Sequence, residues 1–242
     1  MVRVEWRDRV VVVTIDRPER RNAVDHATLL ALADAQRAAR DGEARVLVLT
    51  GAPPAFCAGA DLTGVESGAF VDALVAVLRG FTDLRIPTVA AIDGPALGAG
   101  TQLAVSCDLR IASPTSQFGI PAAKLGLAVD RWTVDRVSAE FGPSVARAML
   151  IAAQTYTAEQ LHLAGGIHRL GTLAEALVWA QQLAELAPLT IAAHKEALEG
   201  LAPPPATDVV FEALRAQAWA SNDADEGRAA FLEKRRPDFL GR

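Results

Sequence analysis

Short apolar strands alternate with helical stretches through the first half of the chain, and this rhythm restricts the fold more than any other feature. Strands are expected at Arg45–Thr50, Thr88–Ile92 and Leu109–Ala112, where nearly every residue is apolar. Strands that are apolar on both faces are typical of parallel sheets covered by helices on both sides. The chain has 242 residues, of which 51% are hydrophobic, so it can bury such a core. The sequence therefore predicts an α/β fold with a mostly parallel sheet.

Local patterns predict the remaining elements. Val2–Trp6 and Val10–Ile15, on either side of a charged turn, predict a hairpin. Asp25 is expected to be the N-cap of a helix that runs to about Arg40. Further helices are expected at Gly68–Arg79, Gly98–Ser106, Thr157–Ala164, Leu173–Ala187, Leu189–Leu201, Asp208–Ala220 and Ala224–Arg235.

A proline run near the end indicates a boundary. Leu201-Ala202-Pro203-Pro204-Pro205 separates a core of residues 1–200 from a helical region of residues 201–242. Trp219 and Phe231 make this region apolar, so we expect it to dock on the core or on another subunit.

Charge and composition exclude several classes of protein. The net charge is −5 and there is no long run of basic residues, which disfavours a nucleic-acid-binding protein. Cys57 and Cys107 lie in apolar stretches without further ligands at suitable spacing, so neither a disulfide framework nor a metal site is expected. We see neither a signal peptide nor an apolar stretch long enough to span a membrane, which favours a cytoplasmic location.

Two glycine-containing segments carry the candidate chemistry. They are Phe56–Leu62 (Phe-Cys-Ala-Gly-Ala-Asp-Leu) and Gly98–Gln102 (Gly-Ala-Gly-Thr-Gln). Small residues let a ligand approach the backbone, and the second segment opens a helix whose first N–H groups lack partners. One N–H group from each segment could bind the same carbonyl oxygen and form an oxyanion hole. Packing of helix on sheet through glycines remains an alternative, whereas a dinucleotide site is disfavoured because Leu103 replaces the third glycine.

Seven stretches, in the same order along the chain, resemble the enoyl-CoA hydratase/isomerase (crotonase) family. They are Asp16-Arg17-Pro18 with Arg21-Asn22-Ala23, Phe56–Leu62, Asp93–Asp108, Phe118-Gly119-Ile120-Pro121, Thr157-Ala158-Glu159 with Ala164-Gly165, Lys195-Glu196-Ala197, and Phe231–Phe239. The resemblance implies a spiral of ββα turns that binds acyl-CoA without another cofactor. It also implies a homotrimer or a dimer of trimers joined by C-terminal helices.

The resemblance assigns roles to individual residues. Ala58 and Ala99 would supply the oxyanion amides, beside Gly59 and Gly98.

Three residues that follow in the first segment would run along the pantetheine and adenine, mainly through backbone atoms: Ala60, Asp61 and Leu62. Asp61 could equally be a local cap or turn residue. Lys234 would reach the CoA phosphates, although an ordinary exposed lysine explains it as well.

Two departures from the family pattern decide the chemistry. The resemblance implies that hydration of a 2-enoyl-CoA in this family uses two glutamates together. One orients the water molecule and the other moves the proton. Gln102 and Ala122 stand at the matching positions. Glutamine can hold water or an acyl oxygen but cannot transfer a proton, and alanine can do neither. General acid–base groups contribute about 10²–10⁴-fold each, so efficient hydration is not expected.

Asp130 is the candidate base for a different reaction. Some isomerases of this family carry a catalytic aspartate in this region, and moving a double bond needs only one base. Asp130 could instead pair with Arg131 or Arg136, or cap the following helix. Trp132 could line the acyl tunnel, and a core tryptophan is the alternative.

Two functions therefore fit the sequence. The first is a non-catalytic protein of lipid metabolism that binds acyl-CoA and delivers it to another pathway. A protein partner could take part in this delivery. The second is an enzyme, an enoyl-CoA isomerase that uses Asp130 or a weak enoyl-CoA hydratase.

Overall fold

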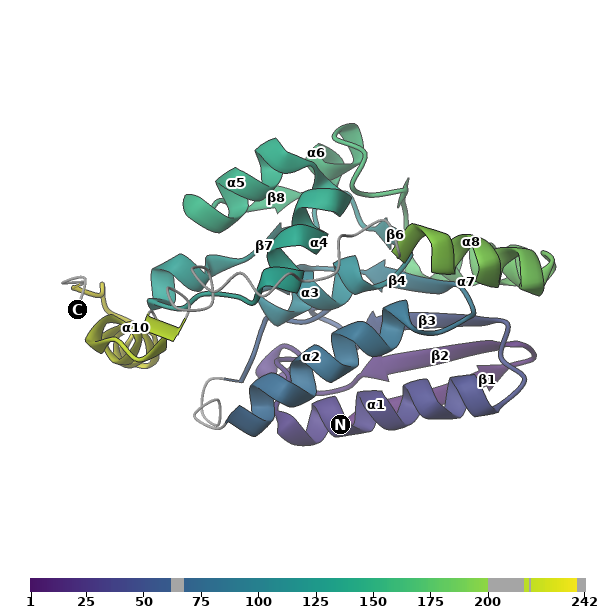
Figure 1. Cartoon of the computed structure of the whole chain (residues 1–242), viewed down its shortest axis with the longest axis horizontal. Coiled ribbons are helices and arrows are strands. Elements are labelled where there is room, and N and C mark those ends of the chain that lie inside the picture. The colour runs from purple at the N-terminus through teal and green to yellow at the C-terminus, as the bar shows by residue number, and fades with distance from the viewer. Residues whose placement is uncertain (62–67, 200–215, 218, 239–242) are drawn as a thin grey trace.

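The computed structural model of the chain describes residues 1–61, 68–199, 216–217 and 219–238. Its main sheet has six strands in the order β1-β2-β3-β4-β6-β9 (Figure 1). These strands are β1 (Val2–Arg7), β2 (Val10–Ile15), β3 (Val46–Gly51), β4 (Thr88–Ile92), β6 (Leu109–Ala112) and β9 (Arg169–Leu170). β1 and β2 form an antiparallel hairpin, and the pairs from β2 to β9 are parallel. The mostly parallel sheet and the hairpin expected from the sequence are therefore confirmed.

A second, smaller sheet and the helices complete the fold. The small sheet has the order β5-β7-β8, with β5 (Pro95–Leu97), β7 (Gln117–Gly119) and β8 (Tyr156–Thr157). The helices are α1 (His26–Asp41), α2 (Gly68–Thr82), α3 (Ala99–Ser106), α4 (Arg131–Phe141), α5 (Pro143–Ile151), α6 (Ala158–Leu163), α7 (Leu173–Ala184), α8 (Pro188–Glu199) and α10 (Asn222–Glu233). Two short 3₁₀ turns are η1 (Pro18–Arg20) and η2 (Pro121–Leu125).

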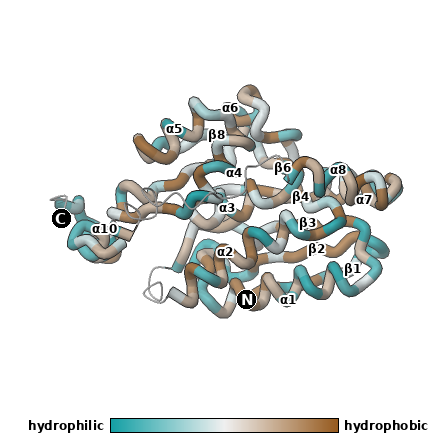
Figure 2. The backbone as a smooth tube through the Cα atoms, in the orientation of Figure 1, coloured by the Kyte–Doolittle hydropathy of each residue, from teal (hydrophilic) through white to brown (hydrophobic). Residues whose placement is uncertain are grey.

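The two faces of the main sheet are buried against different helices. Val11, Val13 and Leu47 point into the larger core, which includes residues of α1, α2 and α3. Val10, Val12 and Val46, the alternate residues of the same strands, pack into a smaller core with α7. Figure 2 shows hydrophobic colouring along β2 and β3 at the centre of the molecule. This two-sided burial explains why these strands are apolar at nearly every position.

The expected helices are present with small shifts at their ends. Asp25 caps α1, because its carboxylate accepts a hydrogen bond from the Thr28 N–H group. Thr157 caps α6 in a reciprocal pair with Gln160. The expected helix at Asp208–Ala220 and the proline run fall mainly outside the described residues, so the proposed boundary at residue 200 stays a prediction.

The last helix packs tightly against the rest of the chain. A Cβ atom on Gly227 of α10 would lie 2.4 Å from the Leu125 carbonyl oxygen, and one on Gly126 would lie 2.5 Å from that of Asp223. The two backbones can approach this closely only because both positions are glycine. α10 therefore lies against η2, at the left edge of the molecule in Figure 1.

Lys195 fastens α8 to the body of the protein. Its ammonium group is buried and donates to the carbonyl oxygens of Phe81 (2.9 Å) and Ile86 (3.2 Å). It also pairs with the Asp108 carboxylate at 2.8 Å, which itself accepts hydrogen bonds from Thr88. One side chain thus joins α8 to the end of α2, the loop before β4 and the loop after α3.

We predict that Lys195→Met lowers the free energy of unfolding by about 3–5 kcal/mol, because it leaves the Asp108 carboxylate partly buried without its cation. Urea denaturation measures this loss. Lys124→Met is the matched control: Lys124 is exposed, and a change of about 0.5 kcal/mol or less is expected there. Equal effects of the two substitutions would contradict the role of Lys195.

Candidate functional site

Backbone hydrogen bonds hold the two glycine-containing segments side by side. The Cys57 N–H group donates to the Pro95 carbonyl oxygen at 3.1 Å. In return the Leu97 N–H group donates to the Cys57 carbonyl oxygen at 2.9 Å. The segment that begins at Phe56 therefore runs parallel to β5, which leads through Gly98 into α3.

Glycines make this approach possible. A Cβ atom on Gly100 would lie 2.1 Å from the Cys57 carbonyl oxygen, a distance that no side chain tolerates. Gly59 and Gly98 both have positive φ angles, 125° and 54°, and a Cβ atom on Gly98 would meet the Gly59 Cα atom at 3.7 Å. The two segments thus face each other through bare backbone, as the sequence predicts.

The two expected oxyanion amides differ in their present partners. Ala99 is the first residue of α3, so its N–H group has no acceptor within the helix. The Ala58 N–H group, by contrast, donates to the Arg21 carbonyl oxygen at 3.0 Å. This corrects the expectation of two free donors: an acyl oxygen would have to share the Ala58 donor with Arg21 or displace it.

An apolar pocket of about 170 Å³ opens at these segments. Its walls come from the 58–60 segment, α2, the start of α3, η2 with the following loop, and the C-terminal region. Its lining residues are Ala58, Gly59, Ala60, Phe70, Val71, Leu74, Val75, Leu78, Gly98, Ala99, Gln102, Ile120, Pro121, Ala122, Leu125, Leu127, Ala128, Val129, Asp130, Trp219 and Phe231. Such a surface suits an aliphatic chain.

Gln102 and Ala122 both line this pocket. The Gln102 side chain is only 6% exposed, and its Nε2 atom donates to the Thr133 Oγ1 atom at 2.7 Å. Ala122 lies in η2 and is half-buried. The structure thus places at one pocket the two residues that the sequence resemblance matches to the hydratase glutamates, and neither side chain can transfer a proton.

Asp130 lines the same pocket and caps α4. Its Oδ1 atom accepts a hydrogen bond from the Thr133 N–H group at 3.2 Å. Arg131 forms an ion pair with Asp135 at 2.8 Å. The helix-capping interpretation is therefore confirmed, and Asp130 is also the one titratable side chain that the described residues present to the pocket.

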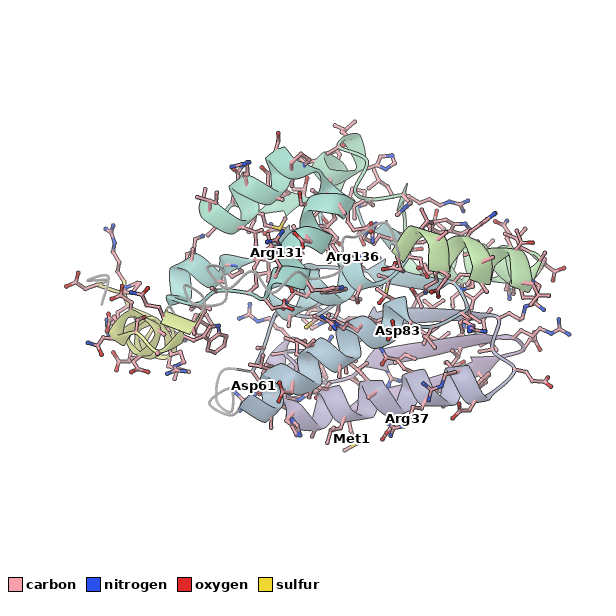
Figure 3. All side chains as sticks on the ribbon, viewed as in Figure 1. Met1, Arg37, Asp61, Asp83, Arg131 and Arg136 are labelled. Atoms are coloured by element: carbon pink, nitrogen blue, oxygen red, sulfur yellow. The ribbon has the colours of Figure 1, made fainter. Side chains whose placement is uncertain are left out.

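For Trp132 the structure favours the second alternative, a core tryptophan, because its partly buried side chain packs against the larger hydrophobic core. Trp132 lines a different cavity, of about 1200 Å³, together with residues of the end of α2, of α4 and of α8. Successive residues of an α-helix are rotated by about 100°, so two residues beyond Asp130 the side chain projects from a different face. Figure 3 shows Arg136, which also lines this second cavity, farther along α4.

Of the residues expected to contact the remainder of CoA, some line the pocket and others do not. Gly59 and Ala60 line the pocket, and Leu62 lies outside the described residues. The Asp61 carboxylate pairs with Arg17 at 3.2 Å. The exposed Lys234 ends α10 in a left-handed conformation and does not line the pocket.

Asn22 is a supporting residue that sequence reasoning did not single out. It is fully buried, and its Nδ2 atom donates to the carbonyl oxygens of Ala52 and Ala55, each at 2.6 Å. Its Oδ1 atom accepts from the Arg17 N–H group at 2.8 Å. Asn22 therefore fixes the loop that leads into the first segment. The only sequence signal for it was the match of Arg21-Asn22-Ala23 to the family pattern.

The C-terminal region contributes to the pocket more directly than expected. Trp219 and Phe231 both line it. The Trp219 indole N–H group donates to the Ala128 carbonyl oxygen at 2.7 Å, so the ring is held at the edge of the pocket.

The described residues give little support for a cysteine nucleophile or a metal site. Cys57 lies beside the pocket, but burial raises the pKa of its thiol to about 12, so it is not a nucleophile at neutral pH. The described residues include no cluster of three or more His, Cys, Asp or Glu side chains that could hold a metal ion. Among the described helices, none is long and apolar enough to cross a membrane.

We predict that Gly100→Ala abolishes ligand binding and lowers the free energy of unfolding by about 2–3 kcal/mol, because the new methyl group would collide with the Cys57 carbonyl oxygen. Thermal unfolding and titration with an acyl-CoA measure the two effects. Gly68→Ala is the control, since no atom lies within 4 Å of its added Cβ position. Normal binding by the Gly100 variant would show that the two segments need not lie so close.

Comparison with known proteins finds relatives along the whole length of the chain. The family model described as enoyl-CoA hydratase/isomerase matches residues 5–242. The chain is 42% identical over 242 residues to a probable enoyl-CoA hydratase, echA6, of Mycobacterium tuberculosis, with all of both chains covered. It is 34% identical to the 2,3-dehydroadipyl-CoA hydratase of Escherichia coli, with 99% of this chain and 98% of the relative covered.

Solved structures give the same result. Methylmalonyl-CoA decarboxylase in complex with 2S-carboxypropyl-CoA matches with a TM-score of 0.91 and 26% identity, covering 100% of this chain and 98% of the other. An enoyl-CoA hydratase/isomerase from Pseudoalteromonas atlantica matches with a TM-score of 0.87 and 29% identity, covering 99% of both. The fold expected from the resemblance is confirmed.

Proposed function

Because this chain belongs to the enoyl-CoA hydratase/isomerase family, we propose that it binds fatty acyl-CoA thioesters and delivers them without hydrating them efficiently. The observation that carries the proposal is the composition of the pocket wall. The Ala99 amide can polarise a thioester oxygen, and apolar residues can hold the acyl chain. The pocket has Gln102 and Ala122 where a hydratase of this family needs proton-transfer groups.

Binding of a thioester and its hydration need different groups in the pocket. An N–H group at the start of a helix stabilises negative charge on a carbonyl oxygen, and this supports binding of a thioester whether or not a reaction follows. Addition of water needs a group that takes its proton as it attacks. Loss of two such groups removes about 10²–10⁴-fold each, which leaves binding without useful hydration.

The rest of the CoA molecule would follow the first segment. Asp61 is held by Arg17, so its contribution would come through the backbone, together with Ala60. No cofactor other than the CoA thioester is part of the proposal. Assembly as a homotrimer or a dimer of trimers, a cytoplasmic location, contact of Lys234 with CoA phosphates and a protein partner in lipid metabolism remain predictions from the resemblance.

We expect 2-trans-enoyl-CoAs to be recovered bound and unchanged after incubation with the protein, as measured by mass spectrometry against a no-protein control. The double variant Gln102→Glu/Ala122→Glu should gain hydratase activity by at least about 10²-fold, since it restores both groups. Hydration by the unchanged protein at ordinary enzyme rates would refute the proposal. Failure of the double variant to gain activity would show that the pocket differs from a hydratase in more than these two residues.

The alternative function is an enoyl-CoA isomerase that uses Asp130. The observation in its favour is that this carboxylate lines the pocket. Its Oδ1 atom binds the start of α4, which leaves Oδ2 as the atom that would take a proton from one carbon and return it to another.

We predict that the protein does not isomerise 3-cis- and 3-trans-enoyl-CoAs. We also predict that Asp130→Asn changes the affinity for acyl-CoA by no more than about threefold, because asparagine preserves part of the helix cap. Product analysis and calorimetric titration measure the two properties. Isomerisation that the unchanged protein performs and the Asn variant loses would establish the alternative function.

A further inference from the structure

The strand β1 has one edge that is open for hydrogen bonding. It is the first strand of the main sheet and, among the described strands, it pairs only with β2 (Figure 1). Met1 and Asp16 exchange two backbone hydrogen bonds, each of 2.6 Å. Hydrogen-bonded and non-hydrogen-bonded pairs alternate along an antiparallel ladder, so the odd-numbered residues of β1 bond to β2. The N–H and C=O groups of the even-numbered residues therefore point to the open edge: Val2, Val4 and Trp6.

This edge lacks the usual features that prevent pairing with another chain. Edge strands are commonly protected by proline, lysine or a bulge. The six residues of β1 include neither proline nor lysine, and their register with β2 is unbroken. Val4 and Trp6 lie on the same face and are 43% and 44% exposed. The Trp6 ring lies over Gly42, where an added Cβ atom would be 2.7 Å from it, so the end of the strand is held against the end of α1.

The charges on the other face of β1 indicate which strand fits the edge. They alternate in sign along the strand, at Arg3, Glu5 and Arg7. The β1 strand of a second copy matches them when it runs antiparallel with Val4 opposite Val4. Arg3 of each copy then faces Glu5 of the other. Directly opposed unlike charges contribute about 0.2–1 kcal/mol per pair, whereas like charges destabilise a sheet.

Neighbouring registers are unfavourable. A register that keeps the open N–H and C=O groups opposite each other can place only Arg3, Val4 or Glu5 near the centre of the pair as the residue that meets its own copy. Arg3 against Arg3, or Glu5 against Glu5, would bring like charges together on the axis. With Val4 on the axis, Val2 lies opposite Trp6 of the second copy, and Arg7 can keep its present ion pair with Glu5 at 2.8 Å.

We infer that two copies of the chain associate edge to edge through β1, with Val4 on the two-fold axis and the main sheet continuing from one copy into the other. The contact is the same surface on both copies, and about six backbone hydrogen bonds join the two strands. It is independent of ligand binding, because β1 does not line the pocket. It also differs from the C-terminal contacts that the resemblance predicts, since it involves only the first strand.

Disulfide cross-linking tests the register. In the paired strands the two Cα atoms at position 4 lie about 5.5 Å apart, within the range that a disulfide spans. Val4→Cys should therefore form a covalent dimer under mild oxidation, as followed on a non-reducing gel. Trp6→Cys is the matched control, because Trp6 has the same face and nearly the same exposure but its two copies lie about 14 Å apart. We expect Val4→Cys to cross-link at least about tenfold faster than Trp6→Cys. The natural Cys57 and Cys107 are buried and do not interfere.

Reversal of charge tests the association without any cross-link. Arg3→Glu places like charges opposite each other twice and should halve the mass of the assembly, as measured by sedimentation. The double variant Arg3→Glu/Glu5→Arg restores unlike pairs and should restore the mass. Both variants lose the ion pair of Arg3 with Asp16, so only the contact between copies distinguishes them. Circular dichroism checks that each variant is folded.

Four results would overturn the β1 contact. They are sedimentation of the unchanged protein as a monomer, cross-linking of Val4→Cys no faster than that of Trp6→Cys, an unchanged mass in Arg3→Glu, and no recovery of mass in the double variant. Acyl-CoA binding should stay unchanged in every one of these variants, so the result does not depend on the proposed function.

Discussion

The contact between Gly100 and the Cys57 carbonyl oxygen is the constraint on which the candidate site depends. It lets the first turn of α3 lie directly against the segment that runs from Cys57 to Ala60. Hydrogen bonds from Cys57 and Leu97 then fix the register, and Ala99, the first residue of α3, lines the pocket. The site is therefore built from backbone, so a change of a side chain around it need not disturb this framework. The framework is compatible with Gln102 and Ala122 at the pocket wall.

The sequence predicted the main sheet well because its strands are buried on both faces. Thr88–Ile92 and Leu109–Ala112 were placed to the residue, since a mainly apolar run between proline or polar neighbours has sharp ends. The small sheet was missed because its strands have two or three residues each, too few to show any period. α5 was missed too, since it follows α4 after a single glycine and has only two buried residues.

The site was predictable where it depends on backbone and less so where it depends on side-chain direction. Gly98, Gly100 and Ala99 could be placed from their sequence pattern alone. The bond between the Ala58 amide and Arg21 could not, because it joins residues 37 positions apart through a loop. The sequence could not decide between the two alternatives for Trp132, because the rotation around α4, counted from its cap at Asp130, separates the directions of neighbouring side chains. Trp219 and Phe231 were recognised as apolar, but nothing in the sequence says that they meet the pocket.

The packing of α10 against η2 has a consequence for how the protein is made. Phe231 belongs to the last helix that the structure describes, yet it lines the same pocket as Ala58. During synthesis the sheet, α2 and α3 leave the ribosome long before this helix does. A nascent chain can therefore form its core while the pocket still lacks one side. The pocket acquires all its described walls only once α10 has been made, and a chain without α10 would lack the wall that Phe231 contributes.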